Sequence, residues 1–113
     1  MDAKTAKALL EPLDHSEFIE RLLTDKNGHC CSLGHLARLT SENPGDYSIG
    51  NCCGYDYRLD DFVNITHEFI MNKYRISGSI TTVNNLSSVG VYNEPLIKDR
   101  VIHLLDDMIA AGY

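Results

Sequence analysis

The sequence predicts a mainly α-helical single domain, and three observations lead to that prediction. Its 113 residues, 43% of them hydrophobic, suit one compact domain with one core. Several stretches repeat apolar residues at helical spacing, and residues typical of helix starts and stops frame those stretches. We therefore expect one domain over residues 1–113 with four to five helices, and a short β-hairpin as an option between residues 26 and 57.

The N-terminal quarter carries two helix-start signals. Asp2 is a suitable cap for a helix through Leu10, which Pro12 ends. The sequence Asp14-His15-Ser16-Glu17 has the pattern of a capping box, so a second helix is predicted over about residues 15–24. The apolar stripe of that helix would be Phe18, Ile19, Leu22 and Leu23.

A third helix should begin at Ser32, which is a good N-cap residue. Its apolar stripe would be Leu33, Leu36 and Leu39. Cys30 and Cys31 then lie at the positive end of this helix, where thiols are either buried in the core or mildly acidified. Because the N-terminus has no secretion signal, we expect reduced thiols at both vicinal pairs, Cys30-Cys31 and Cys52-Cys53.

The C-terminal half predicts a loop and two long helices. Residues 40–57 contain an Asn-Pro-Gly breaker and two further glycines, which indicate a long loop. A central core helix should follow from Asp60 or Asp61, with an apolar face at Phe62, Ile65, Thr66, Phe69, Ile70 and Tyr74. Residues 79–85 suit either a short helix or a strand. The last helix should start at residues 93–95, end at Gly112 and bury Ile97, Val101, Leu104, Leu105 and Met108.

Charge and hydropathy restrict the partners. The net charge of -6 disfavours direct binding to a nucleic acid backbone, where a basic stripe is expected. The apolar runs are too short for a transmembrane helix, so we expect a soluble, cytoplasmic protein with no membrane partner. The acidity indicates an ordinary solvated surface, a mimic of nucleic acid, or attraction to a basic partner.

Catalytic and metal-binding patterns are weak. A zinc site would use His29, Cys31, His35 and Cys52. Adjacent cysteines point apart, however, and no Cys-x-x-Cys pair is present, so no metal or cofactor is expected. A Cys30 or Cys31 nucleophile with a histidine base lacks any known surrounding signature, and the sequence has no phosphate-binding glycine loop. The chain is therefore not expected to be an enzyme.

The best binding candidate is the tyrosine-rich stretch of residues 45–58, with two basic residues further along the chain. Tyrosine rings could stack on a base, and basic side chains could hold a phosphate. The predicted ligand-binding residues are Tyr47, Tyr55, Tyr57, Arg58, Lys73 and Arg75. An alternative is that the tyrosines cover the core.

Two blocks of sequence resemble small uncharacterised phage and prophage proteins. Residues 27–34, Asn-Gly-His-Cys-Cys-Ser-Leu-Gly, are similar to their Gly-x-Cys-Cys-Leu-Gly block, with Ser32 inserted. Residues 79–85, Ser-Ile-Thr-Thr-Val-Asn-Asn, resemble their Ser-Leu-x-x-Leu-Asn-Asp block, with Asn85 in place of the usual Asp. Residues 86–92 are extra before the last helix.

This resemblance implies a phage-type accessory or anti-defence protein that acts by stoichiometric binding in an infected bacterial host. In one version it sequesters a small nucleotide signal, commonly as a homo-oligomer, which the tyrosine-rich stretch favours. In another version its acidic surface blocks a host defence protein, which the net charge favours. A small structural zinc-binding domain is the third alternative.

Overall fold

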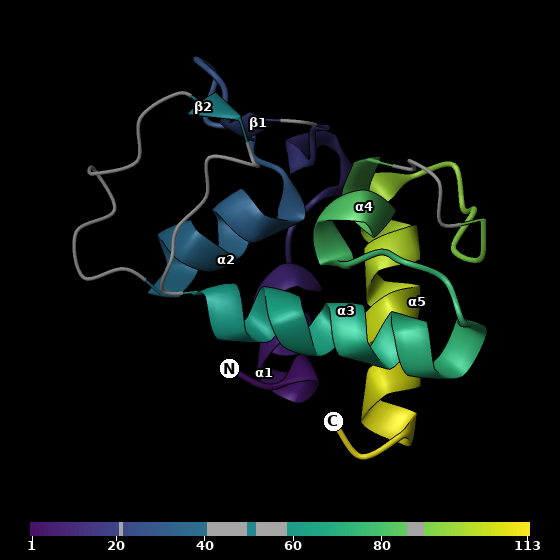
Figure 1. Cartoon of the computed structure of the whole chain (residues 1–113). Coiled ribbons are helices and arrows are strands. Elements are labelled where there is room, and N and C mark those ends of the chain that lie inside the picture. Colours follow the sequence, from purple (N-terminus) through teal and green to yellow (C-terminus); the bar gives the residue numbers. More distant parts are fainter. Residues whose placement is uncertain (21, 41–49, 52–58, 86–89) are drawn as a thin grey trace.

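The computed structural model describes residues 1–20, 22–40, 50–51, 59–85 and 90–113 (Figure 1). Over these residues the chain is mainly helical, which confirms the predicted fold class. The helices are α1 (Ala3–Leu10), η1 (His15–Glu17), α2 (Ser32–Thr40), α3 (Asp60–Tyr74), α4 (Ile80–Asn85) and α5 (Ile97–Ala110). The strands β1 (Leu22–Thr24) and β2 (Gly50–Asn51) form one antiparallel pair.

Helix α5 is the element on which the others assemble. Helices α1 and α4 both pack against it, and α3 lies across it (Figure 1). Its predicted apolar stripe is confirmed at four of five positions, because Val101, Leu104, Leu105 and Met108 are fully buried while Ile97 is half-buried. The predicted apolar face of α3 is also confirmed at Phe62, Thr66, Phe69 and Ile70. The radius of gyration, 12.9 Å, is that of one compact domain.

Helix α5 begins at Ile97, later than the expected start at residues 93–95. Its first helical hydrogen bond runs from the Arg100 N–H to the Leu96 carbonyl. The carbonyls of Glu94 and Pro95 accept hydrogen bonds from the Arg100 side chain instead. The residues before the helix are therefore held by a side chain and not by helical bonds.

The helix predicted over residues 15–24 is wrong. The capping box at Asp14 and Glu17 exists, but it starts only the single turn of η1. From Phe18 onward the chain is extended, because the Glu17 carbonyl and the Ile19 N–H bond to the backbone of Cys30. These distant partners outweigh the local helical pattern. The two-stranded element exists, but its first strand precedes the window of residues 26–57 that was expected to contain both.

Helix α2 begins at Ser32 as expected, although Ser32 does not cap it. The cap is Cys31, whose Sγ accepts a hydrogen bond from the Gly34 N–H (3.3 Å) and whose carbonyl accepts from the His35 N–H. Cys30 and Cys31 are 2% and 1% exposed, so the buried alternative holds for these thiols. Leu39 is 37% exposed and does not belong to the buried stripe.

Residues 80–85 form a helix and not a strand. The Val83 N–H bonds to the Ser79 carbonyl, and the Ile80 N–H bonds to Thr66 Oγ1 on α3 (2.9 Å). The latter bond ties the start of α4 to the middle of α3.

Across the described part of the chain, no helix has the length and apolar character needed to cross a membrane.

Candidate functional site

Two of the six predicted ligand-binding residues fall in the described part of the chain. Lys73 and Arg75 lie at the C-terminal end of α3, where Arg75 has a left-handed backbone with a φ of 60°. Tyr47, Tyr55, Tyr57 and Arg58 lie outside the described residues, as does Cys52 of the zinc set. Leu59, the described neighbour of Arg58, lies at the opposite end of α3, about 24 Å along the helix axis from Arg75.

Lys73 is already neutralised within the protein. Its Nζ lies 3.6 Å from Asp107 Oδ2 on α5. The same ammonium lies over the rings of Phe69 and Tyr74, 5.7 and 5.4 Å from the two ring centroids. An anionic ligand at Lys73 would therefore have to compete with Asp107 for the same charge.

Asp107 is the centre of a polar cluster between α3, α5 and the segment before α5. Its Oδ2 accepts hydrogen bonds from the hydroxyls of Tyr92 (2.8 Å) and Tyr74 (3.3 Å). His103 lies beside it, with Nε2 at 3.8 Å from Oδ2 and Nδ1 bonded to Glu94. We call these residues the Asp107 cluster: Lys73, Tyr74, Tyr92, Glu94, His103 and Asp107.

The Asp107 cluster holds its central group ionised. Burial by itself would raise the pKa of Asp107, but the Tyr92 hydrogen bond and the nearby charge of Lys73 lower that pKa on balance. Burial raises the pKa of Tyr92, and the adjacent Asp107 raises it further, so the Tyr92 hydroxyl remains a hydrogen-bond donor. The contacts of the Asp107 cluster hold α3 and residues 92–94, which precede α5, against α5.

The described members of the zinc set each have another partner. His29 Nδ1 lies 3.4 Å from Asp25 Oδ2, and Cys31 Sγ caps α2. His35 uses both ring nitrogens on Glu17 and Arg38. Among the residues that the structure describes, no group of three or more His, Cys, Asp or Glu side chains is placed to hold a metal.

His35 is a fully buried histidine whose tautomer is set by its two neighbours. Its Nε2 donates to the Glu17 carbonyl (2.7 Å), because a carbonyl can only accept. Its Nδ1 accepts from Arg38 Nη2 (2.9 Å), because a guanidinium can only donate. The ring is therefore neutral, and burial, together with the charge of Arg38, lowers the pKa of His35. Sequence reasoning weighed His35 as a metal ligand or a base and did not single out Arg38.

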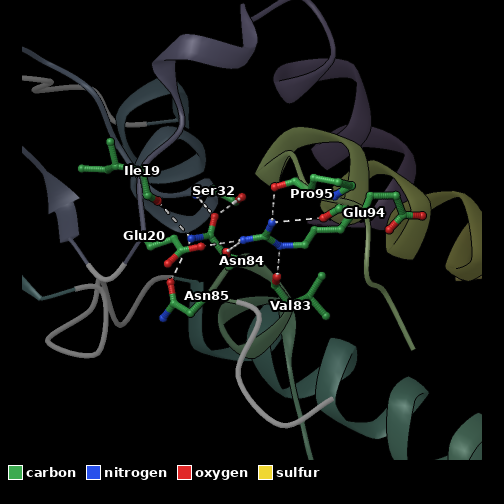
Figure 2. Close-up of polar contacts among 9 residues, drawn as sticks. Ile19, Glu20, Ser32, Val83, Asn84, Asn85, Glu94 and Pro95 are labelled. Atoms are coloured by element: carbon green, nitrogen blue, oxygen red, sulfur yellow. Dashed lines mark hydrogen bonds and ion pairs between the residues drawn. The ribbon is translucent and has the colours of Figure 1, made fainter. Parts of the chain in front are cut away.

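The two sequence blocks meet in the interior at Asn84 (Figure 2). The Oδ1 atom of Asn84 accepts from both the N–H (2.9 Å) and the hydroxyl (2.6 Å) of Ser32. Its Nδ2 donates to the Ile19 carbonyl and to Asn85 Oδ1. An aspartate at position 85 would offer the same acceptor oxygen.

Arg100, which is only 1% exposed, completes this buried polar centre. Its five donors bond the carbonyls of Val83, Asn84, Glu94 and Pro95 and the carboxylate of Glu20. The positive charge thus lies against the C-terminal carbonyls of α4. Sequence reasoning missed Arg100, although a signal was present, since it falls on the same helix face as Ile97, Val101 and Leu104.

Comparison with known proteins identified no relative of this chain. No protein-family model, curated protein or solved structure matches the chain. The contacts of the two blocks place them at the junction between α2 and α4.

Proposed function

We propose that the chain is a phage-type accessory protein that acts by stoichiometric binding, and not by catalysis, in the cytoplasm of an infected bacterial host. The observation that carries the proposal is the position of the two blocks that resemble phage proteins. Their side chains fill the interior at Cys30, Cys31, Ser32, Leu33, Ile80, Val83 and Asn84. The blocks build the scaffold, so binding falls to residues outside them.

The proposed contact segment is residues 45–58, which lie between α2 and α3 in the sequence. The framework on either side of it is buried, with Ala37 near the end of α2 and Leu59 before α3. A long connection held on a rigid framework is a common arrangement for a binding segment. Its tyrosines and Arg58 suit a small nucleotide-like ligand, with a base stacked on a ring and a phosphate on the guanidinium. Binding would occur in a homo-oligomer.

A panel of cyclic nucleotides tests this proposal. Thermal shift would detect binding, and mass spectrometry of heat-released ligand would show whether the ligand is unchanged. We expect one nucleotide to be recovered intact, with its binding lost in Tyr55→Ala and Arg58→Ala and kept in Lys26→Ala. The control removes one exposed positive charge from the turn after β1. A chemically altered ligand would make the protein an enzyme, contrary to the proposal.

A second candidate is an acidic protein that blocks a basic host protein, and the ion pairs around α5 favour it. These pairs contain five carboxylates, Glu11, Glu94, Asp99, Asp106 and Asp107, and two lysines, Lys7 and Lys73. With histidine counted as neutral, this surface keeps an excess of negative charge. Pull-down from a host lysate at low and high salt would test it. Salt-sensitive capture that Asp99→Asn weakens and Asp61→Asn on α3 does not would favour this candidate.

A further inference from the structure

Arg38, in the last turn of α2, is a half-buried cation with most of its donors unused. Its Nη2 bonds the neutral ring of His35. Its Nε is buried, and no hydrogen-bond acceptor reaches it. The fully buried Arg100, by contrast, uses all five of its donors. The contrast between the two guanidinium groups sets Arg38 apart.

The charge of Arg38 is also uncompensated among the described residues. His35 is neutral, so it supplies an acceptor but no negative charge. Glu17, whose backbone carbonyl bonds His35, directs its carboxylate to the Asp14 N–H (3.0 Å) as part of the capping box. No described carboxylate forms an ion pair with Arg38. A partly buried charge without a counter-ion is costly, and its free Nε–H favours an acceptor from outside the scaffold.

We propose that Arg38 is an anion subsite that binds the phosphate group of a ligand. A guanidinium presents Nε–H and Nη–H donors as a planar fork, which matches two oxygens of a phosphate. His35 positions this fork by accepting one Nη2 hydrogen. The inference deepens the proposed function and rests on it for the identity of the ligand, because Arg38 lies seven residues before the proposed contact segment of residues 45–58.

The experiment uses inorganic phosphate and pyrophosphate as probes, titrated against chloride at constant ionic strength. The readout is the side-chain Nε–Hε signal of Arg38 in ¹⁵N nuclear magnetic resonance, assigned by its loss in Arg38→Lys. We expect this signal to shift and saturate with either probe. Phosphate affinity should weaken about tenfold or more in Arg38→Gln, because a charged hydrogen bond is lost. It should stay unchanged in Lys26→Gln, which removes the same charge from an exposed turn.

Several outcomes would overturn the subsite. They are an Arg38 signal that responds equally to chloride, one that never saturates, and equal weakening in Arg38→Gln and Lys26→Gln. If Arg38→Gln does not fold, the signal of the unmodified protein still decides. The nucleotide panel separates this proposal from the proposed function. Saturable phosphate binding at Arg38 with no nucleotide bound would support the subsite and refute nucleotide sequestration. Nucleotide binding that leaves the Arg38 signal unmoved would support nucleotide sequestration and refute the subsite at Arg38.

Discussion

Replacing Arg100 with methionine should be among the most damaging single changes to this fold. Methionine fills similar space, but it leaves four carbonyl oxygens without their donor, on Val83, Asn84, Glu94 and Pro95. At about 1 kcal/mol for each lost hydrogen bond, the free energy of unfolding should fall by about 4 kcal/mol. That is a large part of the roughly 5–15 kcal/mol typical of a domain.

Urea denaturation measures this loss. With an m-value of about 2 kcal/mol/M, Arg100→Met should lower the urea midpoint by about 2 M without changing the m-value. The urea midpoint of Arg100→Lys should lie between those of the unmodified protein and Arg100→Met, because an ammonium has three donors but lacks the planar fork of a guanidinium.

The matched control is Glu20→Gln, which removes the ionic partner of Arg100 and keeps an oxygen acceptor. Glu20 is 45% exposed, so this change should cost less than about 1 kcal/mol. If Arg100→Met and Glu20→Gln lower the midpoint equally, or if Arg100→Met costs less than about 1 kcal/mol, the carbonyl hydrogen bonds do not hold this centre together.

Three further predictions concern His35, Tyr92 and metals. The pKa of His35 is lower in the folded protein than in the unfolded chain, so the unfolded chain binds a proton at His35 more readily. The contribution of neutral His35 to the free energy of unfolding should therefore be fully present above pH 6.5 and decline as the pH falls below it. Urea denaturation at a series of pH values checks this, and His35→Gln should reduce the slope; an identical slope in both proteins would contradict it. Tyr92→Phe should cost about 1 kcal/mol and raise the pKa of Asp107, measured by carboxyl nuclear magnetic resonance, whereas an unchanged pKa would show that the hydroxyl does not act on that carboxylate. The protein should keep its melting temperature in a chelator, and stoichiometric zinc by elemental analysis would contradict this.

The long helices were predictable from sequence because their signals are local. The stripe of α5 and the face of α3 repeat at helical spacing over several turns, and burial follows that spacing. The segment after Glu17 was not predictable in this way. Its extended form depends on backbone bonds to Cys30, a partner that lies beyond a turn and has no signature in residues 18–24.

In the polar interior, too, single residues could be noticed in the sequence, but their distant partners could not be predicted from it. Asn84 was visible within a block of resemblance, but its contacts with Ser32 and Ile19 join residues 52 and 65 positions apart. Cys31 as a helix cap replaces the expected serine because Asn84 engages that serine. Arg38 offers no sequence pattern at all, since its distinction is the absence of a described counter-ion. The ligand-binding role of the tyrosine-rich stretch, residues 45–58, stays a prediction.

The position of α5 has a consequence for how the protein is made. Ribosomes release this helix after every other described element, yet α1 and α4 bury their apolar faces against it. Until residues 97–110 are synthesised, α1 and α4 lack this packing partner, and the apolar side chains that they bury against α5 stay accessible to chaperones and proteases. The described helices can therefore complete their packing only after residues 97–110 have been synthesised. Nascent chains interrupted before residue 97 should be removed by proteolysis and should not accumulate as partial domains.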